Sequence, residues 1–482
     1  MRGISGWNYR PYTLLNAPEE RRELFVCRIA PQTAGFTFDY VDTRAGEHKV
    51  CYRLRGAAQW EEAPCACGSG CLQGLEDQQD YEFYVLRTAD GTASAVRLVR
   101  TGAVPGVIVN YLHPEDDVYA VSGHYLCSPG IVVLPDGRLV ASMDVFGRKT
   151  AQNLTLLFES LDGGNTWRYV TELYPCFWGK LFVHGQRLYM LGMACEYGDL
   201  LLGYSEDGGY TWSKPVRLFN GSNAQEIGPH KAPMPLICAH GRLYTAIDYG
   251  AWKYSIHDNA LLSIDLRDDL MESTHWHLSQ PLAFDAGWKG LPQGKMSGCI
   301  EGNAVEGPDG KVYNMLRLQQ HMAEPSVGKA VLLEADTADP DAPLRFAAVV
   351  DFPLGASSKF VVLRAKEGYV AVGNEAYDSA KPQARNVLSV AVSPDLHHWK
   401  VMTRVVDARD QDSRYVAFQY PDMAIQGDDL LILSRTAWNG AQSYHDNNFI
   451  TCYRITNYPA AMQETLASMN AAANTRDGGN GK

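Results

Sequence analysis

A repeated pattern, in which a glycine-containing turn precedes an apolar strand, most constrains the fold of this chain. The unit begins at residues 135, 184, 240, 308, 366 and 426, in PDGRLVAS, HGQRLYML, HGRLYTAI, PDGKVYNML, KEGYVAV and QGDDLLIL. Successive units lie 49 to 68 residues apart, which leaves room for about four strands in each. Radial repetition of four-stranded sheets produces a β-propeller. The repeat therefore predicts an all-β, six-bladed β-propeller.

A second motif, S-x-D-x-G-x-T-W, occurs in SLDGGNTW (160–167) and SEDGGYTW (205–212), with a degenerate copy in SPDLHHW (393–399). This motif is the Asp box. Its aspartate caps its own turn, its glycine adopts a left-handed conformation and its tryptophan packs between sheets. Asp162 and Asp207 are therefore assigned to the fold and not to catalysis.

The rest of the chain divides around the repeat. Residues 1–110 hold short alternating runs such as LFVCRIA, FTFDYVD and YEFYVLRT, which predict a small antiparallel β-sandwich. Within it, GLEDQQDYEFYVL resembles the fibronectin type III pattern, and the domain is either a binding module or a structural wing. Residues 111–460 form the predicted propeller, with HDNNFITCYRITNY as a closing strand. Residues 461–482, rich in Ala, Asn and Gly, predict a flexible tail.

Composition narrows the class of function. A net charge of −12 argues against a nucleic-acid partner or a basic membrane-binding patch. We find neither a signal peptide nor a run of about 20 apolar residues, so the prediction is a cytoplasmic protein without a membrane span. The 26 Tyr and 10 Trp residues would suit sugar stacking where they are exposed, although most are expected in the core.

The eleven cysteines are odd in number and scattered, which fits reduced thiols better than a disulfide framework. Their one cluster, Cys65, Cys67 and Cys71, has no fourth Cys or His at a zinc-site spacing, and we interpret it as a loop with free thiols. No motif implies a metal or an organic cofactor. The oligomeric state is not fixed by the sequence.

The stretch EGNAVEGPDGKVYNMLR (301–317) predicts a β-hairpin around its PDG turn. Such a hairpin would place Glu301 and Arg317 at the same end of one sheet. A buried carboxylate beside a guanidinium is either a structural salt bridge or part of a catalytic group. The hairpin alone favours the structural interpretation.

With Asp boxes on a six-unit repeat, residues 112–460 resemble the sialidase (neuraminidase) superfamily of glycoside hydrolases. The resemblance implies a tyrosine nucleophile with a glutamate beside it, an arginine triad and an aspartate acid/base. EGNAVEGPDGKVYNMLR is similar to the glutamate strand and second arginine, which gives those roles to Glu301 and Arg317. RNVLSVAVSPDLHHW gives the third arginine role to Arg385, and FQYPDMAIQGDDLLILSR gives the nucleophile role to Tyr420.

The chain departs from the family pattern at the first arginine. Cys127 and Ser128 stand where that arginine is expected, and Arg148 or Lys149 from the following loop could replace it. The acid/base residue is also open. Asp144 is the only carboxylate near that loop, and it is either the acid or a turn cap.

Further polar and aromatic side chains stand at strand boundaries that should reach the same face. We expect some of them to line a substrate pocket, although each alone is more often structural; they are His230, Lys231, Lys359, Arg435, His445 and Asp446. Trp178 and Trp438 are either sugar-stacking platforms or packing between blades.

Three functions remain open from the sequence. The first is an exo-acting, retaining glycosidase that releases a terminal sialic acid or related acidic sugar from a small acidic oligosaccharide. The second is a polysaccharide lyase, motivated by His230, in which arginine neutralises a uronate while Tyr and His move protons. The third is a non-catalytic glycan binder, suggested by the missing first arginine and the added sandwich. The ordered set of Glu301, Arg317, Arg385 and Tyr420 favours the first.

Overall fold

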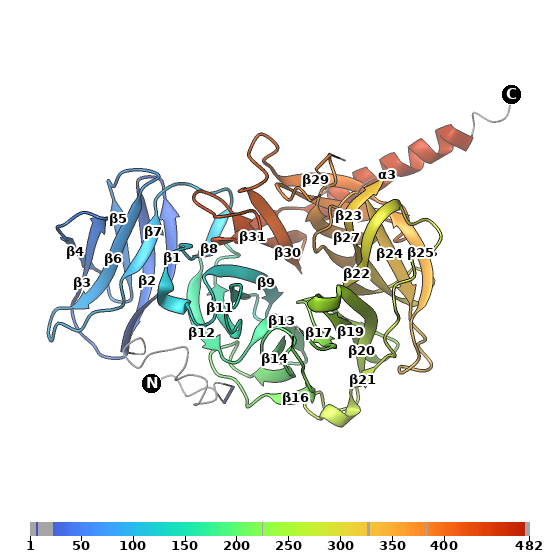
Figure 1. Cartoon of the computed structure of the whole chain (residues 1–482), viewed down its shortest axis with the longest axis horizontal. Coiled ribbons are helices and arrows are strands. Elements are labelled where there is room, and N and C mark those ends of the chain that lie inside the picture. The colour runs from blue at the N-terminus through green and yellow to red at the C-terminus, as the bar shows by residue number, and fades with distance from the viewer. Residues whose placement is uncertain are drawn as a thin grey trace.

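The computed structural model describes residues 6–7, 23–223, 225–324, 328–378, 380–381 and 383–477. Within them the chain is almost entirely β, and its strands form eight sheets (Figure 1). Two sheets lie at the N-terminal end, and six follow in chain order. The almost all-β class is as expected from the sequence. Residues 1–5, 8–22 and 478–482, parts of the predicted first domain and tail, lie outside the described residues.

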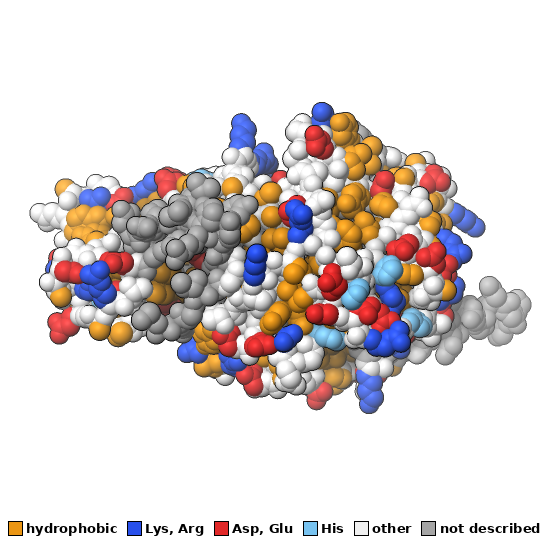
Figure 2. Space-filling view, turned by 90° about the horizontal axis from the view of Figure 1, so that it is seen from below, with side chains coloured by type: hydrophobic (Ala, Val, Ile, Leu, Met, Phe, Trp, Pro, Cys, Tyr) orange, Lys and Arg blue, Asp and Glu red, His pale blue; other side chains and the backbone are white. Residues whose placement is uncertain are grey.

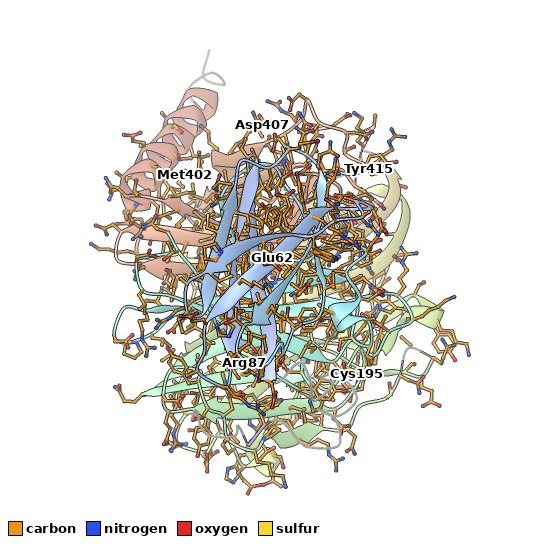
Figure 3. All side chains as sticks on the ribbon, turned by 90° about the vertical axis from the view of Figure 1, so that its left-hand side faces the viewer. Glu62, Arg87, Cys195, Met402, Asp407 and Tyr415 are labelled. Atoms are coloured by element: carbon orange, nitrogen blue, oxygen red, sulfur yellow. The ribbon has the colours of Figure 1, made fainter. Side chains whose placement is uncertain are left out.

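Two sheets form what we call the N-terminal unit. One has the order β1 (Leu24–Gln32), β2 (Gly35–Asp42), β5 (Ser69–Gln73), and the other the order β4 (Glu61–Cys65), β3 (His48–Leu54), β6 (Asp80–Arg87), β7 (Arg97–Arg100). Alternation along β6 buries Phe83, whose ring lies 4.8 Å from that of Phe36 and 5.1 Å from that of Phe38. Figure 3 shows the unit from its outer end, with Glu62 and Arg87 labelled.

Six sheets form what we call the repeat region. Their strands, sheet by sheet, are β9 (Tyr125–Val133), β10 (Leu139–Phe146), β11 (Leu154–Ser160) and β12 (Arg168–Leu173); β13 (Phe177–His184), β14 (Arg187–Met193), β15 (Leu200–Ser205) and β16 (Val216–Phe219); β17 (Gly228–His230), β18 (Leu236–Ala239), β19 (Arg242–Ala251), β20 (Ile256–Asp265) and β21 (His277–Leu278); β22 (Gln293–Glu306), β23 (Val312–Glu324), β24 (Lys329–Glu334) and β25 (Arg345–Asp351); β26 (Val361–Ala365), β27 (Gly368–Asn374), β28 (Val387–Ser393) and β29 (Lys400–Asp407); and β30 (Ala417–Gln426), β31 (Asp429–Ala437) and β32 (Phe449–Ile455) with β8 (Val107–Tyr111). Each repeat unit found in the sequence supplies the turn before the second strand of one sheet, or before β19 in the five-stranded sheet.

The repeat units form these hairpins for local reasons. The turn glycines Gly137, Gly310 and Gly427 have φ angles of 85°, 77° and 60°, a left-handed conformation that glycine adopts without a Cβ clash. The strands that follow are buried on both faces, because neighbouring sheets cover each side. They therefore read as continuous apolar runs and not as alternating ones.

The Asp boxes stabilise their own turns, as expected from the motif. Asp162 accepts hydrogen bonds from the backbone N–H of Thr166 (2.9 Å) and from its hydroxyl (2.6 Å). Asp207 repeats both contacts with Thr211 at 2.9 and 2.6 Å. The tryptophans that end the two motifs are buried in separate hydrophobic clusters. Both aspartates thus belong to the fold.

The last sheet joins the two ends of the repeat region. Strand β8 pairs with β32 in antiparallel register, with Tyr111 opposite Phe449 and their rings 4.7 Å apart. The closing segment HDNNFITCYRITNY does enter this sheet as β32, but the outer strand is β8, from the N-terminal side. The boundary predicted between residues 110 and 111 therefore falls inside a strand of the repeat region. Composition changes little there, so the sequence did not reveal it.

The predicted flexible tail is wrong over residues 461–477, because helix α3 (Tyr458–Asp477) covers them. Ala, Met, Gln, Glu and Leu in this segment favour a helix, and Pro459 stands in its first turn, where proline is tolerated. Tyr458 and Met462 are buried in a cluster with residues of β28 and β31, which anchors the start of the helix.

Among the described residues, no helix has both the length and the apolar character needed to cross a membrane. Figure 2 shows acidic and basic side chains intermixed on the face seen from below.

Candidate active site

The first strands of four sheets carry one non-glycine residue in the left-handed conformation: Ser128 (φ 50°), Trp178 (50°), Glu301 (57°) and Tyr420 (48°). The strand register shifts next to each of them. A bulge of this kind redirects a side chain, at a cost of about 1–2 kcal/mol for the left-handed backbone. Trp178, Glu301 and Tyr420 are turned in this way into one cavity.

The cavity has a volume of about 610 Å³, within the range of small-molecule sites. Ten of the side chains singled out in the sequence line it: Arg148, Lys149, Trp178, His230, Glu301, Arg317, Arg385, Tyr420, Arg435 and His445. Segments some 270 residues apart in sequence thus meet in one place. Their catalytic and binding roles stay predictions, while their proximity is observed.

Arg317 joins the two central residues of the predicted catalytic group. Its Nη1 donates to Oε2 of Glu301 at 2.7 Å and to the Tyr420 hydroxyl at 3.0 Å. Arg317 lies opposite Ile300 in the β22–β23 pair, so the hairpin predicted from the PDG turn is present, although both strands are longer than expected. Burial alone would lower the pKa of Arg317, but Tyr420 and Glu301 outweigh it and raise that pKa.

Three guanidinium groups surround the ring of Tyr420. The Cζ atoms of Arg317, Arg385 and Arg435 lie 6.0, 5.4 and 5.2 Å from its centroid. Arg385 is fixed by hydrogen bonds to Oε1 of Gln419 (2.5 Å) and the carbonyl of Ser357 (2.9 Å). Burial lowers the pKa of Arg385, and the nearby positive charges of Arg317 and Arg435 add to that effect.

Arg435 is the third guanidinium group beside Tyr420, whereas the sequence suggested Arg148 or Lys149 as the replacement for the missing first arginine. It donates to the side chain of Asn447 and to the carbonyl of His445. Arg148 and Lys149 do line the cavity, but no contact of either with Tyr420 is seen among the described residues. A signal was present in the repeat itself: Arg435 stands eight residues after Gly427, much as Arg317 stands seven after Gly310.

Another part of the wall is aromatic. The ring of His230 lies 4.4 Å from that of Trp178 and 5.4 Å from that of Trp252. Within the described part of the chain, neither ring nitrogen of His230 has a hydrogen-bond partner, and its Nδ1 stands 3.5 Å from Asp248. Next to it, burial and the neighbouring His230 lower the pKa of His257 to about 3.

Asp144 does not reach the cavity, which contradicts its assignment as acid/base. Its side chain is fully buried, accepts from Thr155 Oγ1 at 2.5 Å and accepts from the backbone N–H of Trp178 at 2.7 Å. Burial raises the pKa of Asp144 to about 7, against the effect of these hydrogen bonds. Its short side chain braces the neighbouring sheet from within β10, so Asp144 is a structural residue, although not the turn cap that was the alternative from the sequence.

Lys359 also lies outside the cavity lining. Its ammonium is fully buried and donates to the carbonyl of Pro421 at 2.7 Å. Lys231 is buried as well, and an ion pair of 2.5 Å joins the neighbouring Lys180 to Asp422. Burial lowers the pKa of Lys359 to about 8 and that of Lys231 to about 7. Lys359 therefore lies in the interior and does not line the cavity.

His445 and Trp438, also singled out in the sequence, have different places. His445 lines the cavity with its ring 5.4 Å from that of Phe146, and burial, followed by the charge of Arg435, lowers its pKa to about 4. Trp438 donates its indole N–H to the carbonyl of Ala103 and packs between the N-terminal unit and the repeat region. Trp438 is therefore a packing residue, whereas Trp178 lines the cavity.

Sequence reasoning missed Glu196, Gln152 and Trp252 in the cavity. Glu196 accepts from Gln152 Nε2 at 3.0 Å and from the Trp252 indole N–H at 2.9 Å. These residues come from three hairpin loops of three different sheets. No motif or fixed spacing relates them, so only the folded structure brings them together.

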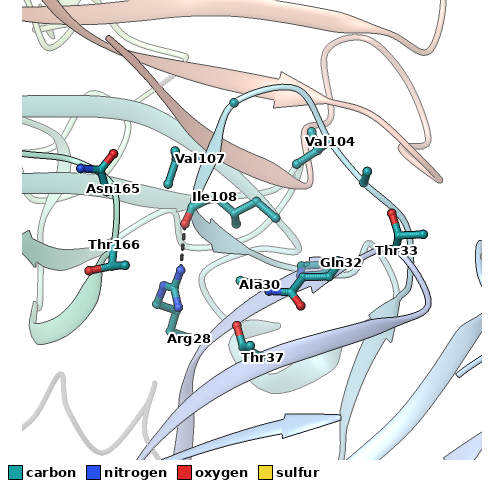
Figure 4. A pocket seen from close by; sticks show the side chains of 13 residues that line it. Arg28, Ala30, Gln32, Thr33, Thr37, Val104, Val107, Ile108, Asn165 and Thr166 are labelled. Carbon is teal, nitrogen blue, oxygen red and sulfur yellow. Dashed lines mark hydrogen bonds between the residues drawn. The ribbon is translucent and has the colours of Figure 1, made fainter. Parts of the chain in front are cut away.

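A second cavity, of about 500 Å³, lies between the N-terminal unit and the repeat region (Figure 4). Its one charged lining residue, Arg28, donates to the carbonyls of Ile108 (2.9 Å) and Val109 (2.8 Å). No carboxylate, histidine or tyrosine is among the described residues that line it. This second cavity therefore lacks the carboxylate, imidazole and phenol groups that line the first cavity. Across the described residues, no three His, Cys, Asp or Glu side chains are grouped to hold a metal ion.

The sequence and the structure were each compared with known proteins. The model of the BNR repeat-like domain family matches residues 192–432, half of the chain. An α-L-arabinofuranosidase mutant from Fusarium graminearum, in complex with an iminosugar inhibitor, is similar with a TM-score of 0.50 and 12% identity over 73% of this chain and 98% of that one.

Two further solved structures are similar over 90% of this chain. They are the Hadza microbial sialidase Hz136 (13% identity, 93% of that chain, TM-score 0.48) and a PL25 ulvan lyase (11% identity, 94% of that chain, TM-score 0.42). No curated protein matches the sequence. At such identities the structural likeness bears on the fold alone. On the family match, which covers half of the sequence, the chain belongs to the BNR repeat-like domain family.

Proposed function

We propose that this protein is an exo-acting, retaining glycoside hydrolase that releases a terminal sialic acid or related acidic sugar from short oligosaccharides. The observation that carries the proposal is the set of three guanidinium groups whose Cζ atoms lie within 6.0 Å of the Tyr420 ring centroid. Guanidinium groups bind carboxylates through paired, planar hydrogen bonds. A substrate carboxylate held there would place the adjacent anomeric carbon near the tyrosine hydroxyl.

The chemistry of such a substrate favours a tyrosine over a carboxylate as nucleophile. The anomeric carbon of a sialic acid bears a carboxylate, which would repel an anionic side chain but not a neutral phenol. In the proposed mechanism Glu301 takes the hydroxyl proton of Tyr420, and the phenolic oxygen attacks the anomeric carbon. Arg317 contacts both residues in advance of the reaction.

We infer that the six sheets of the repeat region are the blades of a six-bladed β-propeller, closed by β8. We also infer that the N-terminal unit is a fibronectin type III-like sandwich that serves as a structural wing. Support for the wing comes from its contacts with the segment around β8: Arg28 donates to β8 carbonyls, and a buried 2.7 Å ion pair joins Arg97 to Asp116. The side chains of Arg28 and Arg97 thus bind groups of this same chain at the junction, as expected for a structural wing.

The proposal is tested with a fluorogenic α-linked sialoside, comparing the wild type with Tyr420→Phe. The control is Tyr415→Phe, which changes an exposed tyrosine near the edge of the molecule in Figure 3. We expect dye release by the wild type and the control, and a loss of about a thousandfold or more in Tyr420→Phe. Full activity of Tyr420→Phe would refute the nucleophile role. No release by the wild type would refute sialic acid as the sugar, and uronic and neutral glycosides would be tried next.

A second candidate function, polysaccharide lyase activity, is favoured by His230. Its ring lines the cavity, and neither of its buried nitrogens has a hydrogen-bond partner among the described residues. A ring nitrogen of this imidazole could remove the proton next to a uronate carboxylate bound by the arginines. An unsaturated product that absorbs ultraviolet light would identify this reaction, whereas saturated reducing sugars alone would exclude it.

A further inference from the structure

The glycosidase proposed above needs a group that protonates the leaving oxygen, and Asp144 does not supply it. The cavity lining includes two carboxylates, Glu301 and Glu196. Glu301 is ion-paired with Arg317 at 2.7 Å. For Glu196, no ion pair is found among the described residues, and the two hydrogen bonds to its carboxylate come from the neutral side chains of Gln152 and Trp252.

This difference suits two separate roles. The carboxylate of Glu301, ion-paired with Arg317 beside Tyr420, can accept the proton of the Tyr420 hydroxyl. A carboxyl group held by neutral donors can carry a proton, release it and take it back. Each oxygen of Glu196 has one donor, which fixes the plane of the group without neutralising its charge.

The loop that bears Glu196 is well anchored. Tyr197, the next residue, is fully buried, and its hydroxyl lies 2.8 Å from Nε2 of His257. The loop is closed by a 2.7 Å hydrogen bond from the Ala194 N–H to the Asp199 carbonyl. Gln152 stands in the loop after β10, the region where the family resemblance led us to look for the acid. The loop after β10 thus contributes Gln152, which holds the carboxyl group, while Glu196 itself comes from the loop after β14 in the next sheet.

We infer that Glu196 is the general acid/base of the glycosidase, an assignment that rests on the proposed function. In the first step the Tyr420 oxygen bonds to the anomeric carbon, the glycosidic C–O bond breaks, and the leaving oxygen takes the proton of Glu196. In the second step the Glu196 carboxylate takes a proton from water. The water oxygen then bonds to the anomeric carbon, and the electron pair of the breaking bond returns to the Tyr420 oxygen.

Leaving-group dependence tests this role. Glu196→Gln keeps the size and the hydrogen-bonding reach of the side chain but cannot donate a proton as an acid does. With a sialosyl-lactose, whose leaving oxygen needs protonation, we expect turnover to fall about a thousandfold. With a 4-nitrophenyl sialoside, whose leaving group needs no proton, we expect a rapid burst of one nitrophenol per active site, followed by slow turnover that added azide accelerates.

Matched variants separate this role from a loss of folding. Glu206→Gln changes an exposed glutamate and should behave as the wild type on both substrates. Gln152→Leu removes one donor to Glu196 and should shift the basic limb of the pH profile of kcat/KM, which reports the general acid, without abolishing turnover. Wild-type turnover of the lactoside by Glu196→Gln would overturn the assignment, as would equal losses on the two substrates. A wild type inactive on both would instead overturn the proposed function, and with it the role of Glu196.

Discussion

Two pairs of residues occupy the same place in different sheets and do different work. Asp144 lies opposite Cys127, Arg317 opposite Ile300 and Arg435 opposite Gln419, in each case next to the register shift between the first two strands of the sheet. Asp248 lies opposite His230, the last residue of β17. In each case the residue follows the turn glycine by seven or eight positions. One position of the repeat thus holds carboxylates in some sheets and guanidinium groups in others.

Side-chain length separates the two uses. The short carboxylates bind the backbone of the next sheet, where Asp144 accepts from the N–H of Trp178 and Asp248 accepts from the N–H of Glu301 at 2.9 Å. The longer guanidinium groups extend into the cavity and contact Tyr420. The repeat therefore provides equivalent positions. A short side chain at this position binds the backbone behind the cavity, whereas a long one lines the cavity itself.

Arg317→Met should have the largest effect, because it removes the one group that contacts both Glu301 and Tyr420. We expect kcat/KM on an acidic glycoside to fall by about a thousandfold or more. Steady-state kinetics on folded protein, checked by circular dichroism, gives the measurement. Arg345→Met, which changes an exposed arginine, is the control. A loss of less than tenfold in Arg317→Met would show that this position braces the sheet and does not serve the reaction.

Arg435→Met should come next, with a loss of about a hundredfold in kcat/KM, expressed mainly in KM if this group binds the substrate carboxylate. Arg435→Lys should recover part of the loss because it keeps the charge but not the planar fork. Arg148→Met is the decisive comparison, since both arginines line the cavity. A larger effect at Arg148 than at Arg435 would return the third arginine role to the loop after β10.

Asp248→Asn and Asp144→Asn should differ in activity more than in stability. Each weakens a buried hydrogen bond to backbone, which costs about 1–3 kcal/mol of the free energy of unfolding. Only Asp248 holds the backbone of Glu301, so kcat should fall about tenfold in Asp248→Asn and stay near the wild-type value in Asp144→Asn. Thermal unfolding and kcat per folded molecule measure the two effects. An equal loss of kcat in both variants would contradict the division between them.

The smallest effect is a pH dependence of stability. Burial raises the pKa of Asp144 to about 7, above its value in the unfolded chain. Between about pH 4 and pH 7 the folded state therefore binds more protons at this site, and its contribution to stability is lost as pH rises through that window. The free energy of unfolding of the wild type, relative to Asp144→Asn, should decline from pH 4 to 7 and then level off. A difference that grows with pH would contradict this.

Much of this architecture was accessible from the sequence. Glycine turns before apolar strands identified the six units, and the Asp boxes predicted their own hydrogen bonds. The ordered set of Glu301, Arg317, Arg385 and Tyr420 was identified by resemblance, and the structure brings it together in one cavity. These features depend on the spacing of residues within short segments, and that spacing can be recognised in the sequence alone.

The remainder depends on contacts that have no local signature. Glu196 stands in an unremarkable loop, and its place in the cavity depends on Gln152 and Trp252 from other sheets. Asp144 was assigned to catalysis because it is a lone carboxylate near a strand end, and only its burial shows otherwise. Arg435 could have been found by aligning the repeat units with one another, since its position matches that of Arg317.

The pairing of β8 with β32 imposes an order of events on biosynthesis. Val107 is translated some 345 residues before Cys452, the residue opposite it. The ring of sheets therefore cannot be sealed until nearly the whole chain has left the ribosome, and until then β8 and β30 to β32 lack their final neighbours. Contacts so distant in sequence fold slowly and leave strand edges open to other chains. A nascent chain that ends before β32 would leave β8 unpaired, so it would fold inefficiently and would be bound by chaperones.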